Sequence, residues 1–232
     1  MRLALFDLDH TLLPIDSADT WSYFVVRHGG LDPIAYGARI REFARTYKAG
    51  TFDVDGYVAF QMELLSLFPR ATLDRWQRHF MEEHVRPHIR PEARALVESH
   101  RARGDELALV TGTNAYVVTP IAREFGIEHV LAVEPEVVRG APDGRFTGGH
   151  VGTHSYQEGK VRKVEEWLAE HARSWDDTTT FCYGDSINDL PLLERVTHPV
   201  VTNGDAPLRA IAAERGWQTL ELFGTSAAQV AT

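Results

Sequence analysis

The first ten residues restrict the fold more than any other stretch of the chain. Leu3 to Phe6 form an apolar run that ends abruptly at two acids, Asp7 and Asp9. Such a run predicts a buried strand with carboxylates at its C-terminal end, where ligands bind in open α/β sheets. Because the chain must turn there, the two carboxylates are expected to face different parts of a ligand. Thr11 adds a hydroxyl that can cap the turn.

The rest of the chain favours an α/β fold. Strand-like runs at 106–110, 130–133 and 179–183 alternate with helix-like segments at 91–103, at 114–125 and from Gly159-Lys160 onward. This alternation predicts a Rossmann-like, doubly wound parallel sheet with helices on both faces. Pro120 is expected to kink the helix at 114–125 or to place its start later. The glycine-rich stretch 137–152 predicts a hairpin.

A helical block separates the first strand from the others. Four helices are expected, from Asp16 or Ser17 to residue 29, from Asp32-Pro33 to residue 50, over 53–68, and from Thr72 onward. Apolar and aromatic residues repeat in them at helical spacing, which is typical of packed helices. We therefore expect a core domain of residues 1–13 and 90–232 with a helical cap domain, residues 14–89, inserted into it.

Composition narrows the function classes. The 232 residues are 44% hydrophobic and 25% charged, as in ordinary globular proteins with a large core. The formal net charge of −9 argues against a nucleic-acid partner, although local donors can still bind a small anion. The single cysteine, Cys182, excludes a disulfide framework and is expected to be a buried, inert thiol. No apolar run reaches membrane-spanning length, and the N-terminal strand leaves no room for a signal peptide. We therefore expect a cytoplasmic location.

Polar groups at the strand ends predict phosphoryl transfer. Asp7 is the expected nucleophile, which would form an aspartyl-phosphate and divide one difficult step into two. A carboxylate approaching a phosphate dianion needs a cation, and Mg²⁺ suits a site of few carboxylates. Its expected ligands are the Asp7 carboxylate, the Asp9 main-chain carbonyl and Asp185. Asp189 is expected to orient Lys160 or a metal-bound water.

Two further predictions concern the phosphate and the leaving group. Thr111 and Lys160 are expected to bind the phosphoryl oxygens, assisted by main-chain N–H groups near Leu8 and Gly112. Asp9 is the expected general acid that protonates the leaving alkoxide and then the base that activates water. Its ordinary pKa of about 3.9 is too low for this task, so we expect the charge of Asp7 and exclusion of water to raise it.

These residues resemble the four motifs of the haloacid-dehalogenase-like phosphatases, in the right order and over nearly the whole chain. The matching motifs are Asp7-x-Asp9-x-Thr11, Thr111-Gly112, Lys160, and Gly184-Asp185-Ser186-x-Asn188-Asp189. The helical insert after the first motif resembles the cap of the phosphoserine-phosphatase-like branch. The resemblance implies a magnesium-dependent phosphomonoesterase that works through an aspartyl-phosphate. Proteins of this size in that branch are often assigned as histidinol phosphatases.

One departure from the phosphoserine phosphatases concerns the substrate. Asp16 stands near their cap glutamate and could hold a substrate ammonium. At the position of their cap arginine, which binds the substrate carboxylate, this chain has Gln61, and without a guanidinium a carboxylate is bound poorly. An amino-alcohol phosphate such as histidinol phosphate therefore fits better than phosphoserine. Thr11, Gly112 and Asn188 are further candidates for substrate contacts.

Each residue also has a simpler interpretation. Taken alone, Lys160 is typical of a solvated helix lysine, Thr111 of a strand-end cap and Asp16 of a helix N-cap. Their joint placement at strand ends favours catalysis. Two other functions stay open, a phosphotransferase that passes the group to a small alcohol and a regulatory module without turnover. A monomer and a homodimer are both compatible with the sequence.

Overall fold

The computed structural model describes residues 1–141 and 143–224, and a seven-stranded sheet forms its centre. The strand order is β4-β3-β2-β1-β5-β6-β7. All neighbouring strands pair in parallel except β3 and β4, which are antiparallel. The strands are β1 (Arg2–Phe6), β2 (Glu106–Asn114), β3 (His129–Val137), β4 (Phe146–Val151), β5 (Thr179–Gly184), β6 (His198–Thr202) and β7 (Gln218–Leu220). The predicted α/β fold with a doubly wound sheet is confirmed.

Helices cover both faces of the sheet. One face packs against α7 (Glu158–Glu170), α8 (Leu190–Arg195) and α9 (Ala206–Arg215), and the other packs against α5 (Pro91–Arg101) and α6 (Ala115–Glu124). Side chains of β1 alternate between the two faces of the sheet. Leu3 and Leu5 pack on the side of α7, α8 and α9, and Ala4 and Phe6 pack on the side of α5 and α6. Burial on both faces explains why β1 reads as a continuous apolar run. Cys182 is buried in the α7 layer, as predicted.

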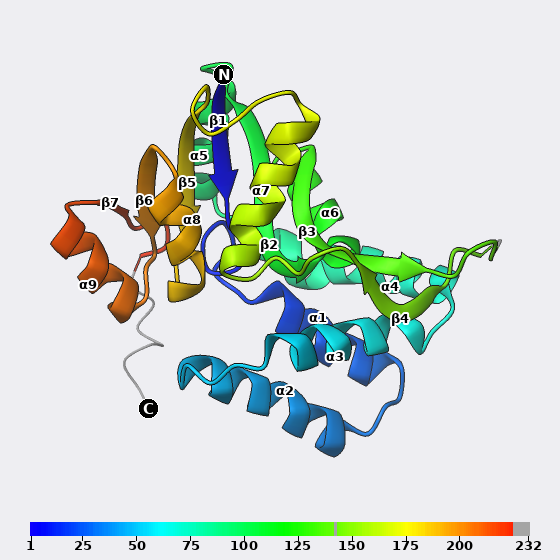
Figure 1. Cartoon of the computed structure of the whole chain (residues 1–232). Helices are drawn as coiled ribbons and strands as arrows, with labels where there is room; N and C mark the ends of the chain where they lie inside the picture. Colours follow the sequence, from blue (N-terminus) through cyan, green and yellow to red (C-terminus); the bar gives the residue numbers. More distant parts are fainter. Residues whose placement is uncertain (142, 225–232) are drawn as a thin grey trace.

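After the turn that follows β1, residues 17–101 form helices joined by short connections. These residues contain α1 (Ser17–His28), α2 (Pro33–Lys48), α3 (Val54–Ser66), α4 (Arg70–Phe80), a π-helical turn η1 (Met81–Val85), a 3₁₀ turn η2 (Arg86–His88) and then α5. Asp16, Asp32 and Asp53 cap the first three helices by accepting main-chain N–H groups. In Figure 1 the arrow of β1 points toward the layer of α1, α2 and α3. These helices therefore face the carboxyl edge of the sheet.

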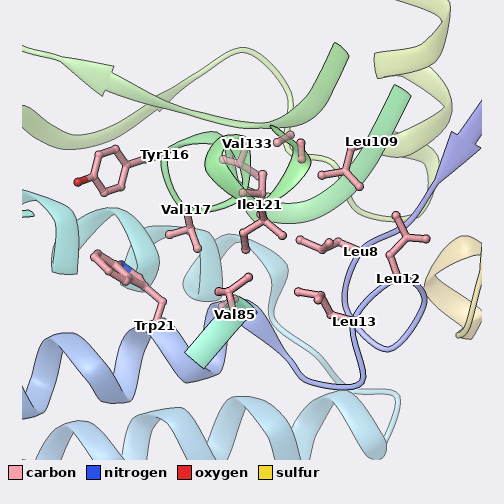
Figure 2. Packing of buried hydrophobic residues seen from close by; sticks show 14 of the residues in the cluster. Leu8, Leu12, Leu13, Trp21, Val85, Leu109, Tyr116, Val117, Ile121 and Val133 are labelled. Carbon is pink, nitrogen blue, oxygen red and sulfur yellow. The ribbon is translucent and has the colours of Figure 1, made fainter. Parts of the chain in front are cut away.

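One hydrophobic cluster joins this helical block to the sheet. Leu8, Leu12 and Leu13 of the turn after β1 are completely buried in it. In Figure 2, Leu8 lies between Leu109 of β2 and Val85 of η1, with Leu12 and Leu13 next to it. Complete burial of these three leucine side chains holds the turn in place, because each side chain contributes about 2 kcal/mol of transfer free energy. The turn that follows Asp7 is therefore a fixed part of the core.

Two local predictions need correction. The strand predicted at 130–133 extends to Val137, so the hairpin uses the end of β3 itself as its first arm and β4 as its second. The helix α6 begins at Ala115, next to the predicted start at Asn114, and Pro120 lies inside it, so only the alternative of a later start is wrong. Pro120 has no N–H for the carbonyl of Tyr116, and that carbonyl accepts instead from the Gln77 side chain of α4. A contact from another helix thus satisfies the group that proline leaves open.

No helix within the described ranges has both the length and the apolar character that a membrane span requires.

Candidate active site

The candidate active site lies at the carboxyl end of β1, between β2 and β5. The main-chain N–H of Asp7 donates to the carbonyl of Tyr183 on β5 at 2.9 Å, so Asp7 stays in register with the sheet. The chain then turns back, and the N–H groups of Leu12 and Leu13 both donate to the carbonyl of Leu8 at 2.9 Å. This turn keeps the predicted acids at the edge of the sheet.

Lys160 links two of the predicted carboxylates. It lies in the first turn of α7 with 1% of its surface exposed, and Nζ donates to Oδ1 of Asp7 at 2.6 Å and to Oδ1 of Asp189 at 2.5 Å. Burial alone would lower the pKa of Lys160, but Asp189 and Asp7 raise it above its ordinary value. The side chain is therefore a permanent cation at the centre of the site. The solvated-helix interpretation of Lys160 is wrong.

Asn188 fixes the start of the helix that presents Lys160. Its Oδ1 accepts the main-chain N–H of Gln157 at 2.9 Å, just before α7. Gln157 has a φ of 45°, in the region that non-glycine residues rarely adopt. The contact gives Asn188 a structural role in this arrangement, beside the substrate contact predicted for it.

Three carboxylates gather where the sequence predicted a metal. Oxygens of Asp7, Asp185 and Asp189 lie within 4.8 Å of one another. Both oxygens of Asp189 are already engaged, because Oδ1 binds Lys160 and Oδ2 accepts the main-chain N–H groups of Asp185 and Ser186 at 3.1 and 3.4 Å. The carboxylates of Asp7 and Asp185 are therefore better placed as ligands, and Asp189 holds the ammonium of Lys160.

The charge of this cluster favours a divalent cation. Three carboxylates face one ammonium in a buried space. Burial raises the pKa of Asp7 to about 7 even though Lys160 opposes the shift. Burial and the charge of Asp7 raise the pKa of Asp185 as well. A hard ion with oxygen ligands would offset the surplus negative charge, and Mg²⁺ has this preference. The residues present thus fit the predicted metal.

Asp9 is held from two sides. Its Oδ1 accepts the main-chain N–H of Ser17 at the start of α1 at 2.7 Å, and its Oδ2 accepts the hydroxyl of Thr113 at 2.8 Å. Burial raises the pKa of Asp9 to about 6, and the charge of Asp16 adds to the shift. The sequence analysis predicted that the pKa of Asp9 is raised, and the structure agrees in direction. The charges of Asp7 and Asp9 also act on each other, since Asp9 raises the pKa of Asp7.

Thr111 and Gly112 form the edge of the site on β2. Thr111 is 1% exposed, and its Oγ1 accepts a main-chain N–H two residues further on at 3.2 Å. The ring of Tyr156 lies so close to Gly112 that a Cβ there would come within 2.6 Å of the phenol carbon. Gly112 therefore allows the aromatic ring to close over this turn. Thr11 donates to Oδ1 of Asp185 at 3.4 Å.

The two cap residues predicted to contact substrate lie in different settings. Asp16 is the N-cap of α1, where its Oδ1 accepts the main-chain N–H of Asp19 at 2.7 Å. The prediction that Asp16 caps a helix is therefore confirmed. Burial, with the charge of Asp19, raises the pKa of Asp16 to about 6. Gln61 is 4% exposed, donates to Oγ of Ser22 at 3.0 Å and accepts from Asn114 at 3.5 Å. Its amide helps join α1 and α3 to β2.

Several residues near the site were not singled out from the sequence. Thr113 shares a strand with Thr111 at a spacing of two, so the period of a strand could have indicated it. Tyr47 at the end of α2 donates to Oγ of Ser186 at 2.9 Å, which connects the helical block to the loop after β5. No pattern in the sequence indicated that Tyr156 lies near the site.

Comparison with known proteins agrees with this geometry. Residues 4–194 match the family model described as haloacid dehalogenase-like hydrolase. A histidinol-phosphatase of Neisseria meningitidis serogroup C is 38% identical over 220 residues, covering 94% of this chain and 98% of that protein. A phosphoserine phosphatase of Mycobacterium tuberculosis is 29% identical over 222 residues, covering 93% of this chain and 69% of that protein.

Solved structures give the same answer for the fold. A protein of unknown function from Bordetella pertussis superposes with a TM-score of 0.89 at 43% identity, covering 96% of this chain and 99% of that one. A phosphoserine phosphatase solved as a phospho-aspartyl intermediate analogue has a TM-score of 0.64 at 17% identity, covering 95% and 93%. At that identity the likeness shows the fold alone. The chain therefore belongs to the haloacid dehalogenase-like hydrolases, and within them to the phosphatases that its four motifs predicted.

Proposed function

We propose that this phosphatase hydrolyses a small phosphomonoester through an aspartyl-phosphate on Asp7, with Mg²⁺ as its cofactor. The observation that supports this most directly is Lys160, buried between Asp7 and Asp189 with Asp185 beside them. A buried ammonium shared by two carboxylates leaves the other oxygen of Asp7 available at the mouth of β1. The same group of residues would bind a phosphate dianion poorly without added positive charge.

In the first step Oδ2 of Asp7 attacks phosphorus while Lys160 holds Oδ1. The ester P–O bond breaks as the Asp7 O–P bond forms, and Thr111 and Lys160 bind the phosphoryl oxygens. Asp7, Asp185 and the main-chain carbonyl of Asp9 would hold Mg²⁺, which supplies positive charge that offsets the repulsion between carboxylate and phosphate.

Asp9 moves the protons in both steps. With a pKa of about 6, about one tenth of Asp9 is protonated at pH 7, compared with about one thousandth at its ordinary value. The protonated form gives its proton to the leaving alkoxide. The resulting carboxylate then takes a proton from the water that cleaves the aspartyl-phosphate, which releases inorganic phosphate and restores both acids. Hydrogen bonds from Ser17 and Thr113 keep the carboxylate in place throughout.

The helical block of residues 14–89 is proposed as the cap that selects the alcohol part of the substrate. Asp16 would bind an ammonium group of that alcohol, and Gln61 provides no positive charge for a carboxylate. An amino-alcohol phosphate such as histidinol phosphate therefore suits the site better than phosphoserine. The histidinol-phosphatase from N. meningitidis supports this order of preference.

The test is the variant Asp7→Asn, which keeps the shape of the side chain and removes its nucleophilic oxygen. Hydrolysis of p-nitrophenyl phosphate, histidinol phosphate and phosphoserine is measured with Mg²⁺ and with EDTA. We expect the turnover number to fall by at least about 10³-fold, with far-UV circular dichroism showing that the fold is kept. Asp176→Asn, at an exposed position, is the matched control and should keep full activity. Turnover within tenfold of the native rate in Asp7→Asn would exclude the proposed nucleophile.

A further inference from the structure

The helix α2 is packed less tightly than its neighbour in the helical block. Of the 16 residues of α2, only Gly37 and Ile40 are buried, whereas seven of the 12 residues of α1 are buried. Glycines with positive φ lie on both sides of α2, Gly30 at 64° and Gly50 at 71°. Few buried contacts and flexible flanking residues are features of segments that open locally. The contacts that hold the end of α2 against the core are therefore important for its position.

One hydrogen bond connects the end of α2 to the core. Tyr47, in the last turn of α2, donates its hydroxyl to Oγ of Ser186 at 2.9 Å. Ser186 lies 139 positions further along the chain, in the loop of residues 185–189 that follows β5. Figure 1 shows α2 below the sheet, with its end under this loop. The ring of Tyr47 makes an edge contact with Phe52 at 5.3 Å between centroids, so the hydroxyl is presented by a fixed ring.

A continuous series of hydrogen bonds leads from Ser186 to the proposed nucleophile. Ser186 and Asp189 form a capping box, in which the Ser186 hydroxyl accepts the N–H of Asp189 and the Asp189 carboxylate accepts the N–H of Ser186. The other oxygen of Asp189 accepts from Lys160 at 2.5 Å, and Lys160 donates to Asp7 at 2.6 Å. All four of these residues are less than 10% exposed. A displacement of Ser186 is therefore transmitted to Lys160, because the packed side chains have little room to compensate.

The Tyr47 hydroxyl remains a donor in this position. Burial raises the pKa of Tyr47, and the charges of Asp189 and Asp185 raise it further, although the contact with Ser186 opposes the shift. The phenol is therefore protonated over the whole working pH range. Phenylalanine at this position would keep the aromatic ring and remove only the donor.

We infer that Tyr47 is a positioning residue of the active site, which acts through Ser186 on Asp189 and so fixes the ammonium of Lys160 beside Asp7. The arrangement of the nucleophile then depends on contact between α2 and the core. Tyr47 acts on the side of the phosphoryl group, so its contribution is the same for different leaving alcohols. This inference rests on the proposed function, in which Asp7 attacks phosphorus.

Proton transfer uses a different set of contacts. Asp9 is held by the main-chain N–H of Ser17 and the hydroxyl of Thr113, which are not members of the series that begins at Tyr47. Loss of the Tyr47 hydroxyl should therefore slow the attack by Asp7 and leave the pKa of Asp9 unchanged. The expected signature is a lower kcat with the same pH profile.

The experiment is a double-mutant cycle of Tyr47→Phe and Ser186→Ala, with kcat and KM measured for p-nitrophenyl phosphate and L-histidinol phosphate in Mg²⁺. We expect Tyr47→Phe to lower kcat by about three- to tenfold for both esters, with KM changed by less than about twofold. In the Ser186→Ala protein, adding Tyr47→Phe should cause no further loss, because the contact is already absent. In the Ser186→Thr protein, which keeps a hydroxyl, Tyr47→Phe should cause the full loss.

A second measurement needs neither metal nor substrate. Amide hydrogen exchange in EDTA reports the opening of α2, and the amides of residues 45–48 should exchange about three- to tenfold faster in Tyr47→Phe. Tyr23→Phe removes a hydroxyl from an exposed position on α1 and is the matched control. It should change neither kcat nor the exchange of α2. Far-UV circular dichroism checks that each variant keeps the fold.

The outcomes distinguish the inference from the proposed function. Native kcat in Tyr47→Phe, or a loss on only one ester, would overturn the inference while phosphatase activity stands. A full further loss in the Ser186→Ala protein would overturn it as well, because Tyr47 would then act by another route. If Ser186→Ala has no activity, unchanged exchange of α2 in Tyr47→Phe overturns the inference. A native protein that cleaves no phosphate ester would refute the proposed function and this inference with it.

Discussion

Replacing Lys160 by Met tests the electrostatic description of the site most directly. The ammonium is 2.6 Å from Asp7 and 2.5 Å from Asp189, and the lysine side chain is 1% exposed. Removing one member of a buried ion pair typically lowers the free energy of unfolding by 3–5 kcal/mol, since the other charges stay buried. Methionine fills a similar volume, so a cavity contributes little to the loss. At pH 8 we therefore expect Lys160→Met to lose about 3–5 kcal/mol.

The loss should depend on pH with a definite sign. Asp7 already has a pKa of about 7 beside Lys160, and without the ammonium its pKa must rise further. A carboxyl whose pKa is higher in the folded than in the unfolded state destabilises the fold above the folded pKa, and has no effect below about 3.9. Lowering the pH to 5 protonates Asp7 in the variant and removes much of the repulsion. The difference between native and variant protein should therefore be smaller at pH 5.

The assay is urea unfolding in EDTA at pH 5 and pH 8, followed by circular dichroism. For a chain of this length the expected loss corresponds to a fall in Tm of about 6–20 °C. Lys163→Met, one turn further along α7, is the control and should change the free energy of unfolding by less than about 0.5 kcal/mol. A loss below 1 kcal/mol at pH 8, or an equal loss at both pH values, would refute the reasoning.

Two further predictions concern the same carboxylates. Without metal, the native protein should lose stability as the pH rises from about 4 to 7, because the folded pKa of Asp7, about 7, lies above its unfolded value; saturating Mg²⁺ should remove most of this slope in Tm. An unchanged slope with Mg²⁺ would argue against the metal site. Thr113→Val should raise the pKa of Asp9 above about 6, because it removes a hydrogen bond to the ionised form, and should move the alkaline limb of kcat/KM for an alkyl phosphate to higher pH. Thr113→Ser should restore the native profile, and a limb that stays in place in Thr113→Val would show that the contact has no part in proton transfer.

The location of the candidate site residues could be predicted from the sequence because a parallel sheet brings its strand ends together. Asp7, Thr111 and Asp185 each follow or end an apolar run, and such runs are easily recognised. Once the runs are assigned to parallel strands, the carboxyl ends must meet at one edge. Lys160 followed from the helix after the hairpin, which begins at the same edge. Chain connectivity alone was therefore enough to place these four residues in one site.

The contacts around Asp9 could not be predicted in the same way. Thr113 is 104 residues from Asp9, and Tyr156 follows a hairpin whose length decides where its ring lies. The continuation of α6 through Pro120 depends in turn on Gln77 from another helix. Each of these features is a tertiary contact for which local sequence provides no pattern.

The N-terminus of α1 connects catalysis with substrate choice. Asp16 caps the helix, Ser17 donates its main-chain N–H to Asp9, and Asp19 completes the first turn. A helix N-terminus favours negative charge and thus opposes the rise in pKa that burial causes. The balance of burial and the helix N-terminus leaves the pKa of Asp9 near 6, where the carboxyl can both give and take a proton. A substrate ammonium held at Asp16 would lower the pKa of Asp9 and reduce its protonated fraction. Protonation of the leaving alkoxide should therefore have its optimum at lower pH for a cationic substrate than for a neutral one, and a common optimum for both would contradict this coupling.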